Sequence, residues 1–180
     1  MRKEICALFG VVGPLVGYVS IGVSIALSPW FSWGRNALSD LGHAVKSGVA
    51  PIFNFGLMLT GFLIMIYAVT VLRGYARRTS YSMVISAFIL QLVAAFNEVY
   101  GLLHFVVSFL FFISLGPTSI LYATERKSSL AVIASIIGLL SWVFYWARIY
   151  NAGVAVPETI STLAVLLWII SSAFKIYIGK

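Results

Sequence analysis

The chain has 180 residues, of which 61% are hydrophobic and only 9% are charged. Soluble domains carry about 25% charged residues, so this composition excludes an ordinary soluble protein and predicts one whose solvent is lipid. The formal net charge of +7 comes from a few basic residues at the edges of long apolar runs.

Six apolar runs approach or exceed the length of about 20 residues that a membrane-spanning helix needs. An open strand would leave its amides unpaired in lipid, and the alternation of a barrel strand is absent, so each run is predicted to be a helix. In chain order the predicted spans are 5–27, 51–72, 80–96, 102–123, 129–147 and 157–176. The predicted fold is therefore all-α and polytopic, with a single transmembrane domain over residues 1–180.

The first run resembles a signal peptide, but its apolar stretch is too long and no typical cleavage site follows it. We therefore interpret it as a retained span. Small residues recur in it every three or four positions, at Gly13, Gly17, Ser20, Ser24 and Ser28. That spacing places them on one helix face, where another helix of the same chain can approach closely.

The distribution of basic residues predicts which side of the membrane each end of the helices faces. Six spans place both termini on one side, which would hold Arg2, Lys3, Arg73, Arg77, Arg78, Arg126, Lys127, Lys175 and Lys180. The other side would hold only Arg35, Lys46 and Arg148. By the positive-inside rule this bias predicts a cell-membrane protein with both termini in the cytoplasm, and it explains the net charge without a nucleic-acid partner.

The opposite, extracytoplasmic side collects most of the reactive side chains. Both histidines, His43 and His104, fall there together with the acids Asp40, Glu98 and Glu158. The first connection on this side, residues 28–50, is also the longest, and long ordered loops are often functional.

Within that long loop, the sequence predicts a short helix. Ser39 is a residue type that caps helix N-termini, because its hydroxyl accepts hydrogen bonds from amides one turn on. Asp40 and His43 are three residues apart and would then share one face of this short helix. We expect the loop to be ordered, with Asp40 or His43 in contact with Glu98 or His104.

Four stretches in order resemble a family of six-span membrane proteins grouped as domain of unknown function 998. They are residues 36–42 (NALSDLG), 51–61 (PIFNFGLMLTG), 96–112 with Glu98 and His104, and 156–168 (VPETISTLAVLLW). The resemblance covers nearly the whole chain. It implies a six-helix fold in a membrane, and it implies no particular activity.

Three interpretations of the extracytoplasmic residues remain open. In the first, Asp40, Glu98 and Glu158 form surface pairs with the basic residues 35, 46 and 148 and only hold the loop in place. In the second, a metal-dependent hydrolase would use His43, His104 and Asp40 as ligands of a divalent ion such as zinc. Its candidate catalytic residues are Asp40, His43, Glu98 and His104.

In the third interpretation, which we favour, a polar pocket binds a lipid-like amphiphile from the membrane. The N-termini of three helices and two arginines would attract a phosphate, and the acids favour a head group that also carries a cation. The predicted binding residues are Arg35, Asn36, Ser39, Asp40, His43, Glu98, His104, Arg148 and Glu158.

Overall fold

The computed structural model describes residues 3–179 and contains six helices that are long and apolar enough to cross a membrane. The spans are α1 (Lys3–Ala26), α2 (Ala50–Tyr67), α4 (Arg77–Ala95), α5 (Leu102–Arg126), α6 (Ser129–Trp146) and α7 (Ala155–Tyr177). After α2 come a π-helical turn, η2 (Ala68–Leu72), and the short α3 (Arg73–Tyr75). Two 3-10 helices, η1 (Leu38–Gly42) and η3 (Glu98–Tyr100), lie in connections. The predicted spans are confirmed to within a few residues at each end.

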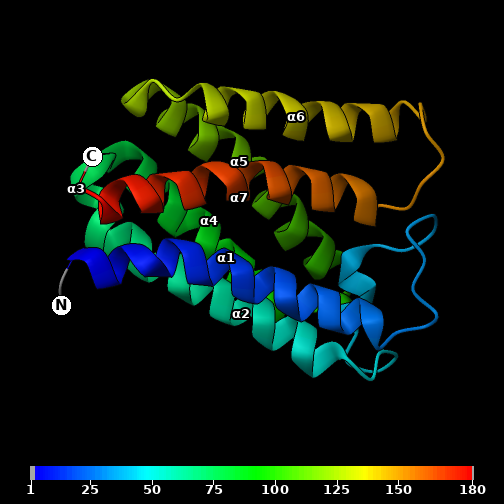
Figure 1. The fold of residues 1–180 in the computed structure, drawn as a ribbon. Helices are drawn as coiled ribbons and strands as arrows, with labels where there is room; N and C mark the ends of the chain where they lie inside the picture. The colour runs from blue at the N-terminus through cyan, green and yellow to red at the C-terminus, as the bar shows by residue number, and fades with distance from the viewer. Residues whose placement is uncertain (1–2, 180) are drawn as a thin grey trace.

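The helices form a closed bundle in which each span packs against its neighbours in the order α1, α2, α4, α5, α6, α7 and back to α1. An additional contact between α5 and α7 leaves α6 at the outside of the bundle (Figure 1). Large apolar side chains such as Phe55 and Leu139, with exposed fractions of 68% and 66%, point outward to where lipid would lie.

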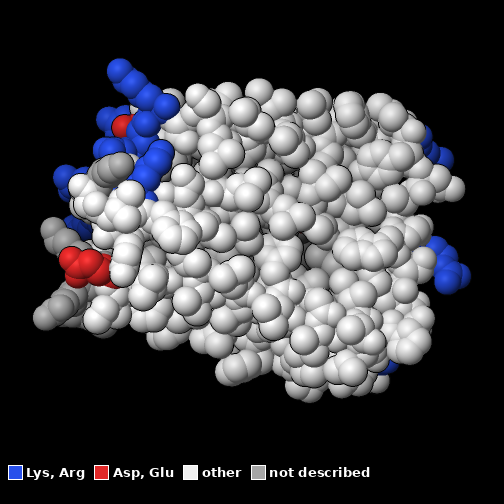
Figure 2. Space-filling model, viewed as in Figure 1, with Lys and Arg blue, Asp and Glu red and all other residues white. Residues whose placement is uncertain are grey.

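The two ends of the bundle differ in charge. We call the end with both chain termini the terminal end, and the end with η1 and η3 the loop end (Figure 1). Lys and Arg side chains gather at the terminal end, whereas few appear at the loop end (Figure 2). Those of the terminal end include Arg73, Arg77, Arg78, Arg126, Lys127 and Lys175. Arg2 and Lys180, which the sequence also assigns to this end, lie outside the described residues.

The small residues of α1 pack against α2. An added Cβ at Gly17 would lie 2.8 Å from the Thr60 hydroxyl, and one at Gly13 would lie 3.1 Å from the Leu63 Cβ. From the other side, a Cβ at Gly56 would fall inside the side chain of Ser20. The predicted close approach therefore takes place between α1 and α2 of one chain.

Near the terminal end, polar side chains satisfy backbone groups that the helices leave unpaired. Glu125 of α5 accepts hydrogen bonds from the Arg78 and Thr79 amides, both at 2.8 Å, and so caps the N-terminus of α4. The Ser80 hydroxyl donates to the carbonyl of Ala68 at 2.8 Å, at the start of the π-helical turn. These contacts satisfy backbone groups where α2 ends and α4 begins.

Candidate functional site

The first loop is ordered and docks on the loop that precedes α7. The Gly153 amide donates to the carbonyl of Trp33 at 2.8 Å, and the Ala155 amide donates to the carbonyl of Asn36 at 3.0 Å. A Cβ at Gly153 would lie 2.5 Å from the Asn36 carbonyl oxygen, so this approach requires glycine. On the α2 side, the Asn54 amide group donates to the carbonyl of Gly42 at 2.8 Å. The loop is thereby fixed on both sides of η1.

The short helix predicted in this loop exists, but Ser39 does not cap it. The helix η1 is preceded by Ala37, whose amide donates to the Asp40 carboxylate at 3.1 Å. The same carboxylate oxygen accepts from the Asn36 amide group at 2.7 Å. Asp40 therefore does the capping that the sequence assigned to Ser39, because a carboxylate at the third helical position can reach back to the start of the helix. Leu41, which is fully buried, holds η1 against the bundle.

A polar cavity of about 450 Å³ lies between η1, η3 and the first loop. It is lined by both acidic and basic side chains and one tryptophan: Trp30, Asn36, Asp40, His43, Lys46 and Glu98. Asp40 and His43 thus line the same cavity as Glu98, although no hydrogen bond joins them to it among the described residues. The lining therefore carries side chains of both charge signs.

Glu98 and His104 form the ion pair of this site. The Glu98 Oε2 lies 3.0 Å from the His104 Nε2, although the two atoms are not aligned as a good hydrogen bond. The other ring nitrogen, Nδ1, lies 2.8 Å from the carbonyl oxygen of Phe96, which can only accept, so Nδ1 carries a proton. The Nε2 atom faces the Glu98 carboxylate and also lies 3.2 Å from the Ser108 hydroxyl. His104 is 5% exposed, and its partner Glu98 lines the polar cavity.

The ion pair predicts a pH dependence of stability. The neighbouring His104 imidazole lowers the pKa of Glu98, against an opposing effect of burial. A lowered folded-state pKa contributes stability above the ordinary glutamate pKa of about 4.3, and that stability is lost as the pH falls through the lower folded value. We expect Glu98→Gln to lower the unfolding temperature near pH 7 and to make little difference once the pH has fallen below the lowered folded-state pKa of Glu98.

This expectation is checked by thermal unfolding of the wild type and Glu98→Gln in detergent across that pH range. The double variant Glu98→Gln/His104→Gln serves as the control, because it should show no more pH dependence than Glu98→Gln alone. A stability difference that stays constant from pH 7 to pH 3 would contradict a stabilising Glu98–His104 ion pair.

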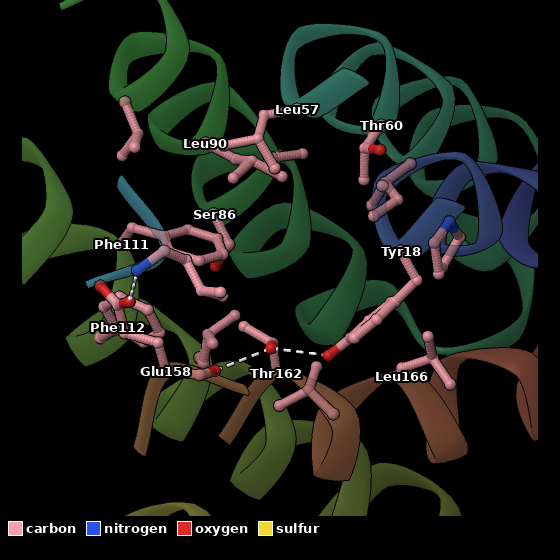
Figure 3. A pocket seen from close by; sticks show the side chains of 18 of the residues that line it. Tyr18, Leu57, Thr60, Ser86, Leu90, Phe111, Phe112, Glu158, Thr162 and Leu166 are labelled. Atoms are coloured by element: carbon pink, nitrogen blue, oxygen red, sulfur yellow. Dashed lines mark hydrogen bonds between the residues drawn. The ribbon is translucent and has the colours of Figure 1, made fainter. Parts of the chain in front are cut away.

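A second, apolar cavity of about 140 Å³ lies inside the bundle, between α1, α2, α4, α5 and α7. Figure 3 shows Leu57 and Leu90 on one side of it and Thr162 and Leu166 on the opposite side. The helix η1 closes its loop end with Leu38 and Ser39. Ser39 therefore lines the apolar cavity, while the next residue, Asp40, lines the polar one.

Glu158 is the acidic residue of the apolar cavity. It lies in the first turn of α7, where the positive end of the helix dipole favours a negative charge, and it is only 7% exposed. Its Oε2 accepts a hydrogen bond of 2.7 Å from the Leu38 amide, seen as a dashed line in Figure 3. Glu158 thus connects α7 to η1 and places a carboxyl group at the closed end of an apolar space.

The basic residues 35, 46 and 148 do not pair with the acids. Arg35 and Arg148 are exposed and line neither cavity, and Lys46 lies in the polar cavity without an ion pair. Among residues 3–179, the ion pair within 4 Å is that of His104 with Glu98. The first interpretation, in which the acids pair with residues 35, 46 and 148, is therefore wrong for the described part of the chain.

The candidate metal ligands do not converge. The Nδ1 of His43 accepts from the Val45 and Lys46 amides at 3.3 Å each, which occupies that nitrogen. Both ring nitrogens of His104 are engaged as described above. Within the part of the chain that the structure describes, no group of three or more His, Cys, Asp or Glu residues could hold a metal ion.

Several residues of the apolar cavity escaped the sequence analysis. Ser108 lies one helical turn after His104, and its hydroxyl oxygen is 3.2 Å from the His104 Nε2. The spacing of four residues could have indicated this contact from the sequence. Tyr18 and Thr162 are joined across α1 and α7 at 2.7 Å. They stand far apart in sequence, so no local pattern could have revealed that they meet.

The comparison with known families agrees with the fold. The family described as "Protein of unknown function (DUF998)" matches residues 11–175, which include nearly all of the six spans. Neither a curated protein nor a solved structure matches this chain. Since the match covers most of the chain, this integral membrane protein belongs to the DUF998 family.

Proposed function

We propose that the protein binds a lipid-like amphiphile at the loop end of the bundle. Its apolar chain would occupy the cavity between α1, α2, α4, α5 and α7, and its polar end would meet η1 and Glu158. The observation that supports this most is the pair of adjoining cavities on the two sides of η1, one apolar and one polar. An apolar enclosure with a few convergent polar groups is the usual form of a small-molecule site.

The size of the apolar cavity sets the size of its occupant. Its 140 Å³ compares with the roughly 150 Å³ of an engineered apolar cavity that binds benzene. It therefore suits an aliphatic segment of about six carbons, such as one end of a longer chain.

The wall between α1 and α7 is the natural path into the cavity from the bilayer. Tyr18 and Ile21 of α1 and Thr162 and Leu166 of α7 all line the cavity and are only half-buried. A membrane lipid could insert a chain there by displacing side chains alone. The polar cavity above η1 would then serve the head group or the passage to water.

The proposal is tested with an aliphatic probe that carries a diazirine in its chain, in nanodiscs of phosphatidylcholine. Light-induced adducts are mapped by mass spectrometry. Leu57 lines the cavity, so we expect the probe to label it. Excess unlabelled amphiphile should abolish this labelling. Labelling of Phe55, on the outer face of the same helix, should persist under that competition, because bulk lipid contacts it. Adducts confined to outer-face residues would refute the proposal.

We also propose that the loop end is extracytoplasmic, because the described basic residues concentrate at the terminal end. Single cysteines can test this in a Cys6→Ser background. Ala44→Cys at the loop end and Ser129→Cys at the terminal end are both exposed sites. In intact cells an impermeant maleimide should label Ala44→Cys and leave Ser129→Cys unlabelled until the membrane is permeabilised. The reverse pattern would invert the orientation.

A further inference from the structure

The side chain of the buried Glu158 has one carboxyl oxygen without a hydrogen-bond partner among the described residues, and this bears on the charge of the ligand. Its Oε2 has the Leu38 amide as a partner, but its Oε1 accepts no hydrogen bond from the described residues, although the side chain lines the apolar cavity. Burying a carboxyl group with one oxygen unpaired costs free energy, unless a ligand in the cavity donates a hydrogen bond to that oxygen.

The polar side chains of the cavity nearest Glu158 on α1, α5 and α7 already have hydrogen-bond partners. The Thr162 hydroxyl donates to the backbone carbonyl of Glu158 at 2.8 Å, so the Tyr18 hydroxyl must donate to Thr162. Ser108 is bound to His104. Glu158 therefore remains as the acidic anchor for a ligand in this largely apolar wall.

The electrostatic surroundings of Glu158 lack a compensating cation. No basic side chain lies within 4 Å of it among the described residues. The titratable groups that act on it electrostatically are the imidazole of His104, which is paired with Glu98, and the acids Asp40 and Glu98. Without a cation beside it, a buried carboxylate is costly, so an ammonium ligand is the partner that this position lacks, whereas an alcohol would satisfy only the open oxygen.

We infer that the apolar cavity takes an aliphatic amine, with its ammonium group against Glu158 Oε1 and its chain among the apolar side chains of α2, α4 and α5. This inference rests on the proposed amphiphile binding and specifies its chemistry. The ammonium supplies both the missing hydrogen-bond donor and the missing positive charge, so the pair is neutral inside the bundle. The ligand class is a primary amine on a chain of about six to eight carbons, alone or as part of a larger lipid.

The test compares n-octylamine with n-octanol, which share one chain and differ in the charge of the polar end. Binding to the full-length protein in phosphatidylcholine nanodiscs is measured by calorimetry, with empty nanodiscs subtracted for partitioning. We expect saturable binding of the amine at least about tenfold tighter than that of the alcohol, because a charge-assisted hydrogen bond is about twice as strong as a neutral one.

The variant Glu158→Gln keeps the acceptor for the Leu38 amide and removes the charge. It should bind octylamine and octanol with equal affinity. If its unfolding temperature shows that it does not fold, Glu158→Asp replaces it, since the retracted carboxylate should weaken only the amine. Retained amine preference in a folded variant would overturn the role of Glu158.

The outcomes separate the two proposals. Equal, saturable binding of both compounds to the wild type would reject the amine and keep the amphiphile site. Failure of both compounds to saturate would reject the amphiphile site itself, and with it this inference.

Discussion

Replacing Gly56 with alanine is expected to destabilise the bundle by about 1–3 kcal/mol. The added Cβ would overlap the side chain of Ser20 on α1, and since a Cβ cannot rotate away, α1 and α2 must move apart. Separation of these helices would also loosen the contact of Gly17 with Thr60, one turn further along the interface. In membranes such close contacts stabilise helix pairs chiefly by packing, so the loss is not recovered elsewhere.

The measurement is unfolding of the purified protein in mixed micelles with increasing dodecyl sulfate. Gly22→Ala is the matched control, because Gly22 lies in α1 and an added Cβ there meets no atom within 4 Å. Its free energy of unfolding should stay unchanged or rise by up to about 1 kcal/mol, because alanine has a higher helix propensity than glycine. Equal stabilities of Gly56→Ala and the wild type would show that α1 and α2 do not pack as described.

The spans were predictable because lipid imposes a strong and local rule on composition. Every predicted run became a helix, and the small residues of the first run face a neighbouring helix as their spacing indicated. The bounds shifted where polar residues join a helix end. For example, α4 begins at Arg77, because Glu125 of a different helix caps it at Arg78 and Thr79. Such capping between helices leaves no signal in the local sequence.

The loop-end site was only partly predictable, for a reason that its residues illustrate. The order of the six spans alone places Asp40, His43 and Glu98 at the same end of the bundle. These residues do line one cavity. The separation of Ser39 from Asp40 into different cavities depends on the orientation of η1. That orientation comes from long-range bonds, such as that of Glu158 with Leu38. Pairing of the acids with arginines looked reasonable from charge alone and fails because Arg35 and Arg148 point to solvent.

The largest expected effect on binding comes from filling the apolar cavity. Ala87 of α4 lines that cavity and is only 3% exposed. Ala87→Leu should place three further carbons in the space that an aliphatic chain would occupy. We expect the saturable binding of n-octylamine to weaken by at least about tenfold, since each displaced methylene forfeits roughly 0.8 kcal/mol of burial.

Stability distinguishes this effect from damage to the fold. A leucine that fills an existing cavity gains packing contacts, so the unfolding temperature of Ala87→Leu should stay unchanged or rise. Ala95→Leu, on an exposed face of the same helix, is the matched control and should bind as the wild type does. If Ala87→Leu proves overpacked and its unfolding temperature falls, Val165→Phe fills the cavity from α7 instead. A stable, filled variant that still binds the amine would place the ligand outside the bundle, because two occupants cannot share one space of this size.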